Sequence, residues 1–86
     1  MDGELPLRIG VIGAGAIGLE HIRNLEILES ATVVAVADTD GASLAAAREL
    51  LEDSMGIMDV EFSTDYLELL QLDSVDAVII VRGAAS

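Results

Sequence analysis

The sequence predicts an α/β fold built on a four-stranded parallel sheet. Apolar, β-branched runs at 7–12, 32–37 and 75–81 alternate with longer stretches of helical periodicity, which is typical of strand–helix–strand units. The last two runs are nearly continuous, as in strands that are covered on both faces. The turns between these elements are short enough for parallel crossovers, so we expect a layered sheet with helices on its two faces.

The first of these runs leads directly into three glycines, Gly13, Gly15 and Gly18. A strand that enters a GxGxxG turn and then a helix is the dinucleotide-binding fingerprint. Gly13 allows the sharp turn, Gly15 lets a pyrophosphate approach the backbone, and Gly18 lets the helix pack close to the strand. We expect the amides of Ala16 and Ile17 to face the phosphates, because N–H groups at a helix start lack partners and favour anions.

The second apolar run ends in Asp38, about 20 residues beyond the last glycine of the fingerprint. At this spacing an acidic side chain hydrogen-bonds the hydroxyls of the adenosine ribose. A carboxylate also repels a 2′-phosphate, and no arginine lies in the turn at 39–42 to receive one. NAD is therefore favoured over NADP, while FAD and S-adenosylmethionine stay open because their sites also use glycine-rich turns.

Helical periodicity follows each of the first three strands. The buried face of a helix over 16–29 is predicted to contain Ile17, Gly18, Ile22, Leu25 and Leu28. An alanine-rich helix is expected over 42–53, with Asp40 as its cap. A third helix is expected over 65–72, where Glu68 is placed to close a capping box.

A short strand over 60–62 completes a chain of three strand–helix pairs followed by a final strand. Right-handed crossovers then give the sheet order 3-2-1-4, with the first two helices on one face and the third on the other. This is a Rossmann-type half domain, and we expect residues 1–86 to form one such domain. The strand at 75–81 lies at an edge of this sheet, so its unpaired amides predict that the isolated chain self-associates or is marginally stable.

The composition is acidic, with 16 aspartates and glutamates, four arginines, no lysine and a net charge of −12. Such a surface repels phosphate backbones and anionic membranes, which argues against nucleic-acid and membrane roles. The acidic start is unlike a targeting peptide, and the lack of cysteine favours a reducing, cytoplasmic setting. His21, the sole histidine, is expected to be partly exposed on a helix flank, and no metal site is predicted around it.

Three segments cover about residues 7–81: LRIGVIGAGAIGLEHIRNL, VVAVADTD and STDYLELLQLDSVDAVIIV. Together they resemble the amino-terminal domain of the glucose-fructose oxidoreductase, inositol dehydrogenase and MocA-like (Gfo/Idh/MocA) oxidoreductases. The resemblance implies an NAD(P)-dependent oxidoreductase that acts on sugars or polyols. Carried over residue by residue, the positions that match the family's phosphate loop and ribose contact are Gly13, Gly15, Ala16, Ile17, Gly18 and Asp38.

The sequence departs from the family pattern after the fourth strand. The family continues there with a Thr/Ser-Pro segment that ends in histidine and then a Glu-Lys-Pro motif, whereas this chain reads Arg82-Gly-Ala-Ala-Ser86. The family's substrate domain is also absent. Alcohol oxidation needs a base beside the substrate hydroxyl. We name no catalytic residue, because Asp38 is the one titratable candidate at the strand ends and the ribose would occupy it.

Three interpretations follow from this departure. The chain is a truncated NAD(P)-binding module that is not catalytic by itself, or it is a fragment of, or partner chain to, an active NAD-dependent dehydrogenase. In the third interpretation it is a truncated product that binds no ligand and whose glycine turn is idle.

Overall fold

The computed structural model describes residues 6–28 and 30–81. Its strands form one parallel sheet in the order β3-β2-β1-β4, which confirms the predicted topology. The strands are β1 (Leu7–Ile12), β2 (Ala31–Ala37), β3 (Glu61–Ser63) and β4 (Ala77–Ile80). The two outer strands are shorter than the central pair, and β4 is shorter than the strand predicted at 75–81.

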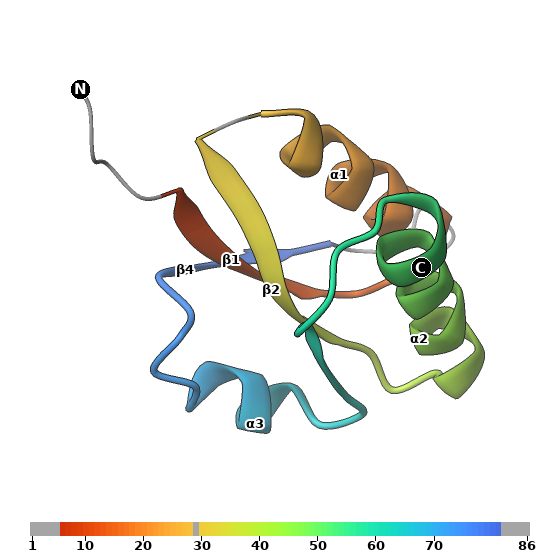
Figure 1. Cartoon of the computed structure of the whole chain (residues 1–86). Coiled ribbons are helices and arrows are strands. Elements are labelled where there is room, and N and C mark those ends of the chain that lie inside the picture. The colour runs from red at the N-terminus through yellow and green to blue at the C-terminus, as the bar shows by residue number, and fades with distance from the viewer. Residues whose placement is uncertain (1–5, 29, 82–86) are drawn as a thin grey trace.

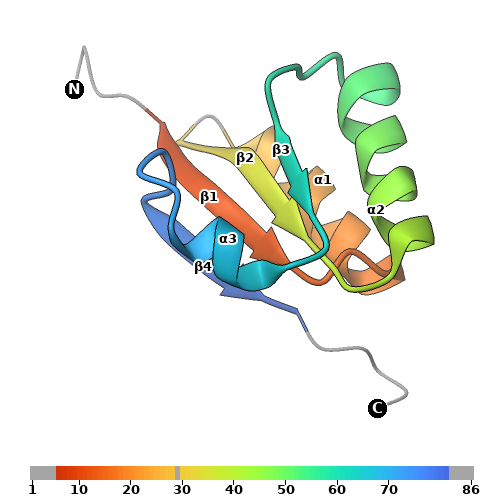
Figure 2. The same ribbon diagram turned by 90° about the horizontal axis from the view of Figure 1, so that it is seen from below.

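The helices are α1 (Ala16–Ile27), α2 (Gly41–Arg48), the π-helical segment η1 (Glu49–Ser54) and α3 (Tyr66–Leu70). Figure 1 shows α1 and α2 on one side of the sheet and α3 on the other, and Figure 2 shows α3 in front of the strands. This confirms the predicted distribution of helices. The predicted end of the first helix near residue 29 lies outside the described residues. No helix within the described ranges has the length and apolar character to span a membrane.

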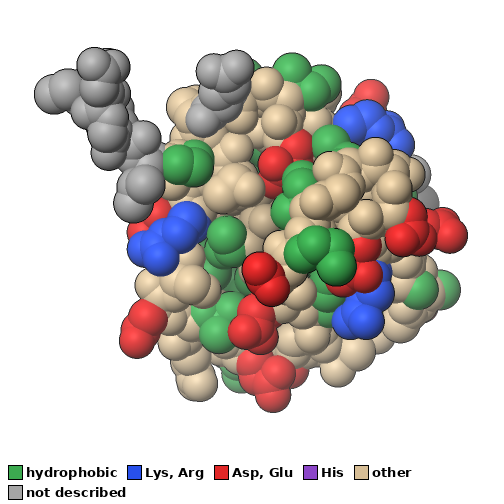
Figure 3. Space-filling model, viewed as in Figure 1, with side chains coloured by type: hydrophobic (Ala, Val, Ile, Leu, Met, Phe, Trp, Pro, Cys, Tyr) green, Lys and Arg blue, Asp and Glu red, His purple; other side chains and the backbone are tan. Residues whose placement is uncertain are grey.

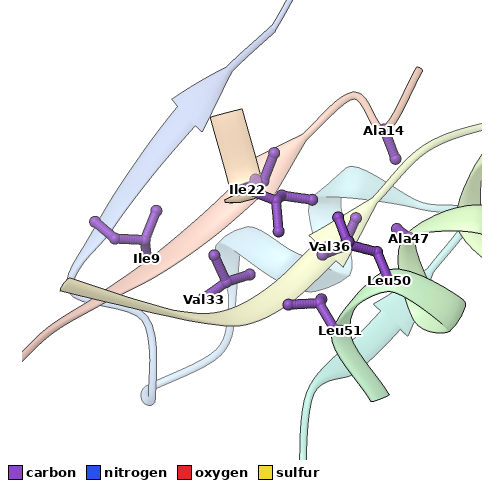
Figure 4. Close-up of a cluster of buried hydrophobic side chains, with 9 residues drawn as sticks. Ile9, Ala14, Ile22, Val33, Val36, Ala47, Leu50 and Leu51 are labelled. Carbon is purple, nitrogen blue, oxygen red and sulfur yellow. The ribbon is translucent and has the colours of Figure 1, made fainter. Parts of the chain in front are cut away.

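The larger core lies between the sheet and the layer of α1, α2 and η1. Its buried side chains are Ile9, Val11, Ala14, Ile22, Val33, Val36, Ala47, Leu50 and Leu51. Figure 4 shows side chains of α2 and η1 directed toward Val36 of β2. In η1 the amide of Met55 donates to the carbonyl of Leu50, five residues back. The wide turn is accompanied by burial of two consecutive leucines in the core.

The second face of the sheet carries a smaller core under α3. Leu69 is 2% exposed and packs against Ala35 and Ala37 of β2. A Cβ at Gly10 of β1 would lie 2.7 Å from Cδ2 of Leu69, so this glycine makes room for the helix. Small residues on the strands therefore let a five-residue helix cover this face at close range.

The buried face of α1 differs from the prediction at two positions. Gly18 and Ile22 are buried and Leu25 is half-buried, as expected, whereas Ile17 and Leu28 are exposed. The first three are four and three residues apart and form one stripe along the helix. Ile17 lies off this stripe in the first turn, and Leu28 has extended backbone because the helix has ended.

Two predicted capping interactions have other partners in the structure. Asp40 occupies the N-cap position of α2, as predicted, but its carboxylate accepts from Oγ of Ser43 at 2.9 Å and not from an amide of the helix. Asp65 caps α3 with its side chain, but Glu68 does not close the predicted capping box. Its Oε1 accepts from Oγ of Ser63 at 2.7 Å, because this hydroxyl lies beside the start of the helix.

An ion pair joins the start of β1 to the segment before β4. The Arg8 guanidinium donates to both carboxylate oxygens of Asp76 at 2.9 and 3.0 Å, and the Arg8 amide donates to Asp76 Oδ2. These hydrogen bonds lower the pKa of Asp76 below its ordinary value. The Cζ of Arg48 in α2 lies 4.8 Å from the centroid of the Phe62 ring, a cation–π contact.

We expect Asp76→Asn to be less stable than the unchanged chain at neutral pH, with the difference shrinking in acid. Because the folded state lowers the pKa of Asp76, its contribution is complete above about pH 4 and disappears as the pH falls through the folded-state value. Urea unfolding of both chains between about pH 7 and pH 2.5 measures this difference. Asp73→Asn removes a neighbouring exposed carboxylate as a control, and a difference independent of pH would contradict the role of Asp76.

Candidate functional site

A cleft of about 260 Å³ lies at the edge of the sheet where the strands end. It is lined by Ile12, Gly13, Ala37, Asp38, Thr39, Thr64, Tyr66 and Val81. These residues come from the carboxyl ends of β1 and β2 and from the segments that follow β3 and β4. Open α/β sheets bind their ligands at this edge, outside the carboxyl ends of the strands.

The glycines of the β1–α1 loop meet two different structural requirements. Gly13 has a φ of +103°, and a Cβ there would lie 2.5 Å from the carbonyl oxygen of Val81. A Cβ at Gly18 would overlap the carbonyl oxygen of Gly13. At Gly15 the backbone φ is −70°, and a Cβ would meet no atom within 4 Å. The packing of this chain therefore requires Gly13 and Gly18, whereas the space at Gly15 is open.

The start of α1 presents donors without acceptors. Hydrogen bonding along α1 begins with Leu19 N, which donates to Gly15 O at 2.8 Å, and the described chain supplies no acceptor for the amides of Ile17 and Gly18. Gly15 is the N-cap and has no side chain, and the first turn contains no acidic residue. The helix begins at Ala16, as predicted. Its N-terminal amides and the positive end of its dipole are thus available to an anion.

Asp38 lies half-buried immediately after β2 and bridges two loops. Its Oδ2 accepts from the amide of Ala14 at 2.7 Å, and its Oδ1 accepts from the amide of Asp40 at 2.8 Å. The preceding amide of the glycine loop, Gly13 N, donates to Ala37 O at 2.7 Å. The structure therefore brings the glycine loop and the predicted acidic residue into direct contact.

Three polar residues that line the cleft were missed by sequence reasoning: Thr39, Thr64 and Tyr66. Thr64 directly follows β3, so its place at the carboxyl end of a parallel strand could have indicated it. Tyr66 is the only tyrosine of the chain and is 48% exposed at the first position of α3. Its position in the cleft depends on how α3 packs on the sheet, for which the local sequence holds no signal.

The titratable side chains that line the cleft are Asp38 and Tyr66. His21 lies on α1, as expected, and is exposed rather than partly exposed. Among residues 6–28 and 30–81, no cluster of three histidine, cysteine, aspartate or glutamate side chains could hold a metal ion. The cleft therefore offers side-chain hydroxyls, apolar surface and the carboxylate of Asp38, which two backbone amides hold in place.

The family model of the Gfo/Idh/MocA proteins, described as an oxidoreductase family with an NAD-binding Rossmann fold, matches residues 7–85. Among the curated relatives, inositol 2-dehydrogenase 2 of Paenarthrobacter aurescens is 40% identical over 77 residues. That match covers 88% of this chain and 21% of the relative. The family match at 7–85 thus includes all four strands of the sheet and the loops that follow β1 and β2.

Solved structures of a dehydrogenase and a ketoreductase are also similar to this chain. Myo-inositol dehydrogenase from Lactobacillus casei, in complex with NAD(H) and myo-inositol, has a TM-score of 0.76 and 36% identity over 88% of this chain and 21% of that one. A mutant 3-ketoreductase from Actinomadura kijaniata, in complex with TDP-benzene and NADP, has a TM-score of 0.73 and 29% identity over 92% of this chain and 23% of that one. This chain spans about a fifth of the length of the relatives it matches. It belongs to the Gfo/Idh/MocA oxidoreductase family and forms part of that family's NAD-binding Rossmann fold.

Proposed function

We propose that this chain binds the adenosine and pyrophosphate portions of NAD and is not catalytic by itself. The observation that carries the proposal is the open space at Gly15 beside amides of α1 for which the described residues supply no acceptor. The pyrophosphate would be held by backbone at Gly13, Gly15 and Gly18 and by the helix start at Ala16 and Ile17. Asp38, which lines the cleft together with Gly13, would accept hydrogen bonds from the adenosine ribose.

The choice of NAD over NADP rests on the charge of Asp38. A carboxylate attracts ribose hydroxyls as hydrogen-bond donors and repels a 2′-phosphate. Arg48 of α2 is engaged with the Phe62 ring, and the residues that line the cleft include no cation. The myo-inositol dehydrogenase complex contains NAD(H) and the 3-ketoreductase complex contains NADP, so the family fold accommodates both.

A longer dehydrogenase is the second candidate, because this chain spans about a fifth of the inositol 2-dehydrogenase it matches. In that case this part would hold the cofactor, which supplies a hydride acceptor when bound, and the substrate would be a polyol or sugar. Alcohol oxidation also requires a base within hydrogen-bond reach of the hydroxyl. Both oxygens of Asp38 are engaged by amides, and we assign it no proton transfer.

The cytoplasmic setting and the assignment of residues 1–86 to one domain stay predictions. A chain that binds no ligand at all is the remaining alternative. Titration of the purified chain with NAD separates this alternative from the first two.

Gly15→Ala should separate binding from folding. We expect it to fold as the unchanged chain does, because its Cβ meets no atom and the φ of −70° suits alanine, but to bind NAD about tenfold or more weakly, because the methyl fills the phosphate space. Gly18→Ala is the matched control and should lose about 1–3 kcal/mol of unfolding free energy through overlap with the loop. Urea unfolding and calorimetry measure both properties, and undiminished NAD binding by Gly15→Ala would refute the site.

Calorimetric titration with NAD, NADP and ADP-ribose tests which part of the cofactor is held. We expect NAD and ADP-ribose to bind with comparable affinity, since the contacts involve the adenosine half, and NADP to bind more weakly. Asp38→Ala should reduce the NAD-to-NADP affinity ratio about tenfold. Asp40→Ala removes an equal charge two residues away and should keep the ratio. Equal ratios in all three chains would exclude Asp38 as the discriminating residue.

We also propose that a second copy of this chain binds at the β4 edge. Within the described residues β4 pairs only with β1, so its outer N–H and C=O groups have no strand partner there. Ile80 at the end of β4 is 68% exposed. Additional exposed apolar side chains on the same face of the sheet come from α3, namely Tyr66, Leu67 and Leu70. An apolar strand edge beside apolar side chains favours pairing with another copy.

Ile80→Lys should prevent this self-association, because a charge at a strand edge opposes pairing. Sedimentation velocity over about a hundredfold range of protein concentration measures the change. Ile27→Lys is the control, since Ile27 is 71% exposed but lies on α1, away from β4. A monomer at every concentration of the unchanged chain would contradict the proposal.

A further inference from the structure

The carboxylate of Asp38 is engaged by the protein itself. Ala14 N and Asp40 N donate to its two oxygens at 2.7 and 2.8 Å, so the side chain is held at both ends. Each carboxylate oxygen has a second lone pair, and the group can therefore keep these amides while accepting ribose hydroxyls. Charge-assisted hydrogen bonds of this length belong to the stronger class in proteins.

The contact fixes the glycine loop from two directions. The Ala14 side chain is 1% exposed and packs in the larger core, while its amide is turned toward Asp38. One residue earlier, Gly13 N donates to Ala37 O at 2.7 Å. Two consecutive amides of the loop are thus attached to the end of β2, the first through a carbonyl and the second through a side chain. A buried amide is destabilising without an acceptor, so the loop depends on this carboxylate.

Ala14, whose amide donates to Asp38, directly precedes Gly15, where the loop has free space. Ala14 is followed by Gly15, which caps α1 and has the free space described above. A shift of Ala14 would therefore move Gly15 and the amides of the first turn. We propose that Asp38 holds the glycine loop in its binding conformation before any nucleotide arrives, so that it is a positioning residue for the phosphate as well as the ribose contact. This inference rests on the proposed function of the loop.

Charge repulsion by Asp38 and positioning of the loop by Asp38 predict opposite changes in anion binding when the carboxylate is removed. A carboxylate close to the phosphate space repels an anion, so its removal should strengthen the binding of pyrophosphate. If Asp38 positions the loop, its removal weakens the binding of pyrophosphate, although this probe has no ribose to contact. The direction of the change therefore separates positioning from charge and from the ribose contact.

The first experiment uses the full 86-residue chain with inorganic pyrophosphate as the probe. NMR titration follows the amides of Ile17 and Gly18 in the unchanged chain, in Asp38→Ala and in Asp40→Ala. We expect Asp38→Ala to bind pyrophosphate about tenfold more weakly and Asp40→Ala to bind it equally or more tightly. Asp38→Asn keeps one acceptor oxygen and should lie between Asp38→Ala and the unchanged chain. Equal or tighter binding by Asp38→Ala would overturn the inference.

The second experiment needs no ligand. Amide hydrogen exchange of Ala14 should be at least about tenfold faster in Asp38→Ala, while that of Val11 in β1 stays unchanged and reports an intact sheet. Unchanged exchange at Ala14 would overturn the inference by itself. If the unchanged chain binds neither pyrophosphate nor NAD, the proposed function is wrong, and the exchange rates alone decide whether Asp38 holds the loop.

Discussion

The carbonyl oxygen of Gly13 occupies the place where a Cβ of residue 18 would lie, so the β1–α1 loop folds back against its own helix. This close approach lies between the end of β1 at Ile12 and the start of α1 at Ala16. The same loop lies against the segment after β4, because a Cβ at Gly13 would approach Val81 O. Because Gly13 and Gly18 have no side chains, the sheet, the helix layer and the loop of the candidate site can pack closely together.

A net charge of −12 and a site for an anionic ligand are compatible because they act over different distances. Figure 3 shows acidic side chains spread over several elements, among apolar and neutral surface. At physiological ionic strength, salt screens exposed charges beyond about 8–10 Å. The amides of α1 would instead act at hydrogen-bond distance, where direction and contact decide the interaction. The surface charge affects the approach of a ligand, and the loop decides its binding.

Local patterns in the sequence were sufficient to predict the strands and their order in the sheet. Apolar, β-branched runs predicted the strands, and the order 3-2-1-4 followed because parallel crossovers have one hand. The spacing of Gly13, Gly15 and Gly18 predicted a turn in which the missing Cβ atoms matter, and the position of Asp38 after β2 predicted its place beside that turn. These features depend on neighbours in the chain or on strand ends that the topology brings together.

Contacts between distant elements could not be predicted in this way. Glu26 is not among the apolar residues predicted for the buried face of α1, yet its carboxylate accepts from Val33 N at 2.6 Å because α1 packs along β2. Tyr66 reaches the cleft only through the docking of α3 on the sheet. By itself, the sequence determined the strand order, the glycine turn and the carboxylate that follows β2. The tertiary structure alone decided that this carboxylate binds Ala14 N, since 24 residues separate the two and only sheet pairing brings them together.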